Sequence, residues 1–130
     1  MSRLAKIKFF VTGLLLSTVF SSGFVQAKGP FTADFQATLS VAELPRPGAQ
    51  VYELIRQGGP FKYEKDGVVF FNRERLLPLE KRGYYREYTV TTPGVRHRGA
   101  RRIVCGGQPK TPDACYYTAD HYASFRKIAP

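Results

Sequence analysis

The feature that most constrains this chain is a change in hydrophobic spacing near residue 60. Before it, Val51, Leu54 and Ile55 stand at positions i, i+3 and i+4, the apolar stripe of a short helix, and Gly58-Gly59 ends the pattern. After it, short β-branched and aromatic runs are separated by turn residues, which is typical of strands. The sequence therefore predicts an α+β fold, with one short helix packed on a twisted antiparallel sheet of about five strands.

The expected strands can be placed from these runs. They cover residues 68–71, 84–91, 98–105, 116–118 and 124–128. Residues 31–39 form an arm or a first edge segment. The turn pair Pro93-Gly94 separates the second run from the third, so residues 84–105 are expected to form a hairpin.

The first 27 residues have the parts of a secretory signal peptide. Arg3, Lys6 and Lys8 make a basic start, and residues 7–20 form an apolar centre. Val25-Gln26-Ala27 then supplies the small residues that a signal peptidase recognises. The alternatives are a buried helix or a membrane anchor, but an anchor needs about 20 apolar residues and polar residues interrupt this run. We predict cleavage after Ala27. The mature protein, residues 28–130, would be extracellular, or periplasmic in a host with an outer membrane.

Charge limits the partners of this mature domain. The whole chain carries a net charge of +10, and the predicted signal holds three of the 20 Lys and Arg residues and none of the ten Asp and Glu residues. The mature net charge is therefore +7. A small, basic, secreted domain indicates a polyanionic partner, either nucleic acid or a membrane surface, and charge alone does not choose between them.

The two cysteines both lie in the exported part. An even number in an oxidising compartment favours a disulfide between Cys105 and Cys115. The alternative is a buried free thiol at position 105 and an exposed one at position 115. Neither cysteine belongs to a C-x-x-C motif and the two histidines are far apart, so we expect no zinc site and no cofactor.

One carboxylate and two guanidiniums are expected to converge on the hairpin. Side chains alternate across a strand, so Arg98 and Arg102 share a face, and Glu87 lies on the neighbouring strand. Such a group suits a phosphodiester, with bidentate donors beside a potential base. The alternative is ordinary ion pairing on a solvated face. However, residues 96–102 hold four arginines and one histidine, more cations than one glutamate can neutralise.

His121 is the second candidate for proton transfer. It lies in a short polar break, residues 118–122, and imidazole is the side chain that titrates near neutral pH. A lone histidine is more often structural or simply exposed. We interpret His97, which lies among arginines, in that way. His121 differs because it is a loop residue beside a tyrosine and near the C-terminal strand.

Four motifs in order resemble a known family. They are GPFKYEKDGVVFFNRERLLP at 59–78, GYYREYTVTTPG at 83–94, RGARRIVCG at 98–106 and YYTADHYASF at 116–125. Together they are similar to the microbial guanyl-specific ribonucleases of the barnase superfamily, and to the actinobacterial branch most of all. The resemblance covers about residues 40–128. It implies a helix packed on a twisted antiparallel sheet, and a monomeric enzyme that acts on single-stranded RNA without a metal.

The resemblance also implies the catalytic residues. Glu87 corresponds to the general base, His121 to the general acid, and Arg98 and Arg102 to the phosphate-binding arginines. Glu87 would take the proton of the ribose 2′-OH and His121 would protonate the departing 5′-oxygen. The first product would be a 2′,3′-cyclic phosphate, which is then hydrolysed to a 3′-phosphate.

Base choice is implied by the F-N-R-E motif. Glu74 would accept hydrogen bonds from guanine N1–H and N2–H₂, and adenine offers no such donor pair. Backbone amides around Asn72 and Arg73 would bind guanine O6, and Phe70 would stack on the base. Tyr122 would lie against the phosphate or the base.

The chain also departs from the family pattern. Relatives join their two ends by a disulfide, whereas Ser40 stands at the N-terminal position. Cys105 matches a position that is usually an unpaired thiol, and Cys115 follows a Pro/Gly-rich insertion at residues 106–114. Phe71 stands where a polar residue is expected, at the rim of the base pocket.

Two other functions remain open at this level. One is a non-catalytic, cationic module that binds RNA or membranes on the same fold. The other is a nuclease toxin that uses the same chemistry and is delivered against competitors. For the enzyme, a barstar-like protein inhibitor is a further expected partner, and the mature form is expected to be free of the membrane.

Overall fold

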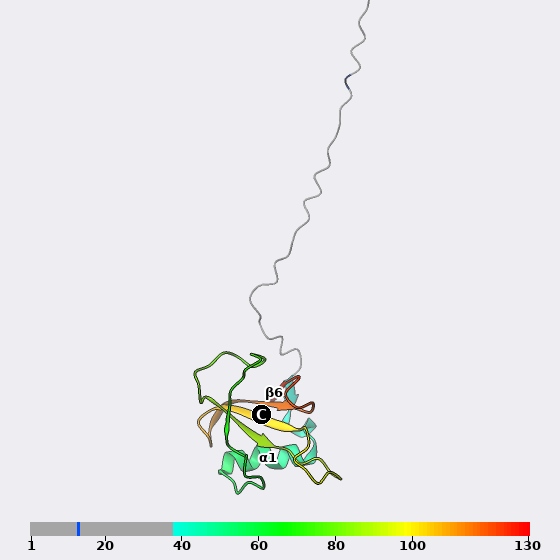
Figure 1. The fold of residues 1–130 in the computed structure, drawn as a ribbon, viewed down its shortest axis with the longest axis vertical. Coiled ribbons are helices and arrows are strands. Elements are labelled where there is room, and N and C mark those ends of the chain that lie inside the picture. Colours follow the sequence, from blue (N-terminus) through cyan, green and yellow to red (C-terminus); the bar gives the residue numbers. More distant parts are fainter. Residues whose placement is uncertain (1–12, 14–37) are drawn as a thin grey trace, which may run out of the picture.

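The computed structural model describes residue 13 and residues 38–130. The predicted signal peptide therefore lies outside the described residues, apart from Gly13. The described part folds around one sheet with one α-helix against it (Figure 1). No helix in this part is long and apolar enough to cross a bilayer.

The expected α+β architecture is confirmed, with one more strand than predicted. The elements are β1 (Thr38–Ser40), a 3₁₀ turn (Val41–Glu43), α1 (Arg46–Gln57), β2 (Val69–Phe70), β3 (Tyr85–Thr89), β4 (Arg102–Gly107), β5 (Pro112–Thr118) and β6 (Arg126–Ala129). The strands run in the order β1-β6-β5-β4-β3-β2. All neighbours are antiparallel except β1 and β6, which pair in parallel at one edge.

Helix α1 forms where it was expected but turns a different stripe inward. A proline lies in its first turn, and Gly58, at φ 84°, ends it in the left-handed conformation that glycine adopts without strain. Its buried residues are Gly48, Tyr52 and Ile55, at helical spacings of four and three. Of the predicted stripe, Ile55 is buried and Val51 packs partly, but Leu54 stays outside the core. The prediction erred because it did not count the amphipathic Tyr52 as a core residue.

The sheet has an apolar cluster on each face. On the helix side, Tyr88, Ile103 and Tyr117 join the residues of α1. On the other side, Leu77, Tyr85, Val104 and Tyr116 pack with partly buried aromatic residues. Side chains alternate along β3, so Glu87 points to this second face, away from the helix.

The predicted hairpin is interrupted by a long loop, and this corrects the placement of Arg98. β3 ends at Thr89 and β4 begins at Arg102, so Arg98 lies in a loop and not on a strand. Two turns bend the loop, one closed by the Val95 N–H bond to the Thr92 carbonyl and one at Gly99, at φ 65°. Strand alternation therefore cannot explain where the Arg98 side chain lies.

The predicted disulfide is present between Cys105 and Cys115. The two residues are direct partners in the β4–β5 register, with 4.1 Å between their Cα atoms. Both belong to the buried cluster on the helix side of the sheet. The alternative of two free thiols is therefore wrong.

Candidate active site

Glu87 is the centre of the candidate site. It stands in the middle of β3, and its side chain is 13% exposed. Each carboxylate oxygen accepts one hydrogen bond from another side chain. The Tyr122 hydroxyl donates to Oε2 at 2.7 Å, and Arg98 Nη2 donates to Oε1 at 3.2 Å. The carboxylate is thus held in one orientation by groups that arrive from two loops.

Thr89 positions the arginine that pairs with Glu87. Arg98 donates from Nε and from Nη2 to the Thr89 hydroxyl oxygen, at 3.0 and 2.8 Å. Thr89 is 2% exposed and shares the face of β3 that carries Glu87. Thr89 was not among the site residues predicted from the sequence. The alternation that placed Glu87 also placed Thr89 beside it, and that was the available signal.

Arg102 reaches Glu87 through Tyr122 rather than directly. Its Nε donates to the Tyr122 hydroxyl oxygen at 3.2 Å, and its guanidinium lies over that ring. Its Nη1 donates to the carbonyls of Gly99 and Arg101, at 2.9 and 2.8 Å. Arg102 is only 3% exposed, so this buried cation both closes the loop and holds the tyrosine.

Tyr122 is a neutral hydrogen-bond donor at ordinary pH. Burial raises the pKa of its hydroxyl to about 12, and donation to the Glu87 carboxylate adds to the shift. Its hydroxyl accepts from Arg102 while it donates to Glu87, so the three side chains form one chain of hydrogen bonds.

His121 stands beside this chain in the turn before β6. Its backbone N–H donates to the Ala100 carbonyl at 3.1 Å, which ties the turn to the arginine loop. Its exposed ring lies 4.9 Å from the Tyr122 ring, centroid to centroid. Asp120 shapes the turn by accepting hydrogen bonds from Ser124 and Thr118, and the Ser124 bond is the main cause of its lowered pKa.

His97, by contrast, is exposed and accepts a hydrogen bond from the Gly99 N–H.

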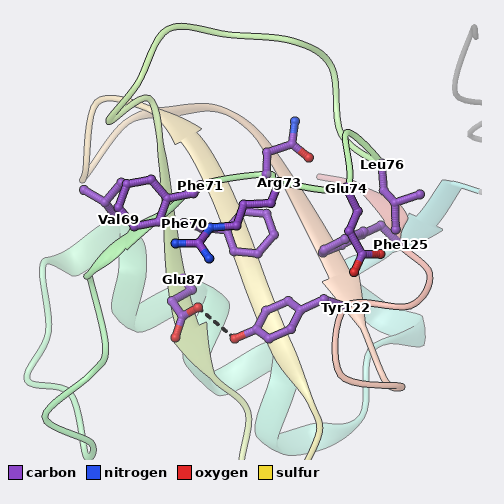
Figure 2. Close-up of a pocket in the computed structure, with 10 residues that line it drawn as sticks. Val69, Phe70, Phe71, Arg73, Glu74, Leu76, Glu87, Tyr122 and Phe125 are labelled. Atoms are coloured by element: carbon purple, nitrogen blue, oxygen red, sulfur yellow. Dashed lines mark hydrogen bonds between the residues drawn. The ribbon is translucent and has the colours of Figure 1, made fainter.

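The five residues expected to bind the guanine base all line one pocket, together with Glu87 (Figure 2). We call it the base pocket. Those five are Phe70, Asn72, Arg73, Glu74 and Tyr122. Phe71 also lines it, at the rim where the sequence placed it, and three further lining residues were not foreseen: Val69, Leu76 and Phe125. Arg98, Arg102 and His121 do not line it, so the pocket adjoins the arginine cluster at Glu87 and Tyr122.

Asn72 holds the pocket loop through its side chain. Its amide nitrogen donates to the Leu77 carbonyl at 2.9 Å, and its amide oxygen accepts from the Leu77 N–H at 3.1 Å. The Arg75 N–H donates to the Asn72 carbonyl, closing a turn over residues 72–75. The N–H groups of the two central residues, Arg73 and Glu74, take no part in that bond. The Asn72 side chain is thus structural, because both ends of its amide bind the backbone of Leu77.

Aromatic rings form one wall of the pocket. Phe70 stacks on Tyr122, with centroids 5.2 Å apart and planes 26° apart, and Phe125 meets Phe70 edge-on at 6.0 Å. Figure 2 shows these rings beside Glu74 and Glu87, whose carboxyl groups are the acidic groups of the pocket. A flat, apolar wall with a carboxylate at its edge suits a planar ring that carries N–H donors.

Comparison with known proteins identifies the family. A family model described as ribonuclease matches residues 26–129 of the 130. Guanyl-specific ribonuclease Sa of Kitasatospora aureofaciens is 48% identical over 95 residues, which cover 73% of this chain and 96% of the relative. The chain belongs to the microbial guanyl-specific ribonucleases. The family resemblance inferred from the four motifs is thereby confirmed.

Other members of the family are similar in sequence and in structure. Guanyl-specific ribonuclease Sa3 of the same organism is 58% identical over 85 residues, which cover 65% of this chain. The chain spans 58% of the length of that relative. The crystal structure of ribonuclease Sa2 with guanosine-2′-cyclophosphate superposes with a TM-score of 0.66, at 45% identity, over 72% of this chain and 96% of that one.

Proposed function

We propose that this ribonuclease cleaves single-stranded RNA on the 3′ side of guanosine, through a 2′,3′-cyclic phosphate that it then hydrolyses to a 3′-phosphate. The observation that carries the proposal is that one pocket holds both Glu74 and Glu87. A base bound at Glu74 would place its own ribose and 3′-phosphate near Glu87, Arg98 and Tyr122. The ligand of the related Sa2 structure is a guanosine cyclic phosphate, which supports the same chemistry here.

Glu87 is the proposed base of the first step. It would accept the proton of the 2′-OH, and the freed 2′-oxygen would attack the adjacent phosphorus. The hydrogen bonds from Arg98 and Tyr122 hold this carboxylate in one orientation for the proton transfer. The same two donors lie where they could bind a phosphate oxygen once substrate is present.

His121 is the proposed acid of the first step. The bond from phosphorus to the 5′-oxygen breaks, and the imidazolium gives its proton to that oxygen. The guanidiniums of Arg98 and Arg102 would stabilise the charge on the non-bridging oxygens. In hydrolysis of the cyclic phosphate, His121 would deprotonate the water and Glu87 would protonate the 2′-oxygen. His121 suits both transfers because its ring is exposed beside Tyr122.

Recognition of guanine is assigned to the turn at residues 72–75. The Glu74 carboxylate would accept from N1–H and N2–H₂, and a backbone N–H of the turn would donate to O6. Phe70, held by its stacking on Tyr122, would support the base. Adenine would present an acceptor to the same carboxylate and lose both hydrogen bonds.

The experiment that tests the function compares synthetic dinucleotides. GpU should be cleaved to guanosine 2′,3′-cyclic phosphate and uridine, while ApU should react far more slowly. The analogue with a 2′-deoxyguanosine should bind and not react, since it lacks the attacking hydroxyl. A purified, folded protein that binds GpU without cleaving it would instead be a binding module.

Export and partners belong to the same proposal. We propose that the protein is secreted after cleavage at Ala27 and works as a monomer over residues 28–130. The disulfide supports an oxidising compartment. A barstar-like acidic protein is the proposed inhibitor, because the site combines Arg98 and Arg102 on a domain of net charge +7. N-terminal sequencing of exported protein should begin at Lys28, whereas intact Met1 in a membrane fraction would indicate an anchor.

A further inference from the structure

A second hollow adjoins the base pocket. It shares residues 70–73 with the base pocket, but neither Glu87 nor Tyr122 lines it. We call its aromatic and cationic residues the basic rim: Phe71, Arg73, Arg75, Lys81 and Arg82. The basic rim thus adjoins the base pocket, and two of its residues, Phe71 and Arg73, line both hollows.

Phe71 is the centre of the basic rim. Its side chain is 52% exposed, although a large apolar ring usually gains by burial. Two cations flank it, with the guanidinium carbon of Arg73 5.6 Å and that of Arg82 5.4 Å from the ring centroid. In Figure 2 the Phe71 side chain points away from Tyr122 and Phe125, so it is not part of the aromatic wall that supports the guanine. An exposed ring beside guanidiniums is the arrangement on which unpaired nucleobases stack.

The cations of the basic rim are available to a ligand. The rim has four of them, and Glu80 is the one carboxylate that lines the same hollow. Over residues 38–130 the structure has one ion pair, between Arg98 and Glu87, so none of the four rim cations is held in an ion pair. Unpaired cations next to a base site attract the phosphates of the same RNA chain.

We propose that the basic rim binds the nucleotide on the 5′ side of the cleaved guanosine. Its base would stack on Phe71, and the phosphate that joins it to the guanosine would contact Arg82. The 3′-phosphate of the guanosine is directed to Glu87 and Arg98 under the proposed function, on which this inference rests. The chain on the 5′ side of the guanosine is therefore the part left free to reach the neighbouring hollow, which neither Glu87 nor Arg98 lines. The single-stranded substrate would thus extend over both hollows.

The test measures kcat/KM on three substrates that share the cleaved bond: GpU, pGpU and ApGpU. Cleavage of GpU by the wild type tests the proposed function by itself. The basic rim is tested by the two ratios, pGpU to GpU and ApGpU to GpU. We expect Arg82→Ala to lower both ratios about 10-fold, because it removes a phosphate contact. Phe71→Ala should lower only the ApGpU ratio, by about 10-fold, because it removes one stacked base.

Two controls make the result specific. Arg56→Ala removes another guanidinium that lies over an aromatic ring, on α1, and should leave both ratios unchanged. Phe71→Tyr keeps an aromatic ring and should restore the ApGpU ratio. Because Phe71 and Arg82 are exposed, neither substitution removes a core residue. Unchanged ratios in both alanine variants would overturn the proposal. GpUpA, extended only on the 3′ side, is measured as a fourth substrate, and a loss confined to it would also overturn the proposal.

Discussion

The Tyr122 hydroxyl donates a 2.7 Å hydrogen bond to Glu87 across 35 positions of sequence. The same hydroxyl accepts from Arg102 Nε, so the buried guanidinium acts on the carboxylate through the tyrosine. This relay joins the loop before β4, the strand β3 and the turn before β6 into one site.

The relay predicts the effect of Tyr122→Phe. The ring and its stacking on Phe70 would remain, while the donor to Glu87 is lost. We expect kcat/KM on GpU to fall about 10-fold, the scale of one hydrogen bond to a charged group. A variant that cleaves GpU at the wild-type rate would show that the bond has no influence on catalysis.

Proton transfer predicts a bell-shaped dependence of kcat/KM on pH, since Glu87 must be ionised and His121 protonated. Glu87→Gln should remove the acidic limb and leave residual activity, because Arg98 and Arg102 still stabilise the charged phosphorus centre. His121→Ala should damage cleavage of GpU most. An aryl 3′-phosphodiester of guanosine should recover much of that loss, since its leaving group needs less protonation. Equal losses on both substrates would remove His121 from the acid function.

Base choice is predicted to depend on Glu74. Glu74→Ala should lower the ratio of GpU to ApU cleavage by about 100-fold, since a missing polar partner at a base site discriminates strongly. Arg102→Ala should instead depress both substrates together. Glu53→Ala, the same substitution on the exposed surface of α1, serves as the control and should change neither rate. A guanine preference that survives Glu74→Ala would contradict the assignment.

The disulfide should contribute to stability and little to catalysis. The bond closes a short loop, with a sequence separation of 10, and lies on the helix side of the sheet. Replacing both cysteines by alanine should lower the free energy of unfolding by about 2–3 kcal/mol, measured in denaturant. Activity on GpU below the unfolding transition should be nearly unchanged, because Glu87 points to the opposite face. Alkylation of the denatured, unreduced protein should find no free thiol.

Alkaline pH is predicted to unfold the protein through its tyrosines. Burial raises the pKa of Tyr84 and of Tyr122 to about 12, and it raises the pKa of Tyr85, Tyr88, Tyr116 and Tyr117 as well. An unfolded tyrosine titrates near pH 10. The folded state therefore favours the neutral hydroxyl, and the resulting stability is complete below about pH 10 and is lost as the pH rises toward 12. Circular dichroism and tyrosinate absorbance should follow one cooperative transition. Full ionisation of these tyrosines without loss of structure would contradict the burial.

Much of the site could be predicted because it depends on local patterns. The period-two runs place Glu87 within a strand, and the order of motifs identifies its family. The compact F-N-R-E segment carries its pocket residues together, since neighbours in one turn stay neighbours in the fold. The helix was placed correctly for the same reason, although its buried stripe centres on Tyr52.

Contacts between distant segments were decided by the tertiary structure alone. Arg98 pairs with Glu87 because its loop folds back onto Thr89, and not because of strand alternation. Cysteine counting favours a bridge, but the β4–β5 register sets Cys105 directly opposite Cys115. By itself, the sequence determined the order of the helix and most strands, the face of Glu87 and the residue types gathered at the site, because these follow from spacing and residue type. The Tyr122 relay and the flanked ring of Phe71 came only with the fold, because both depend on how separate loops meet over the sheet.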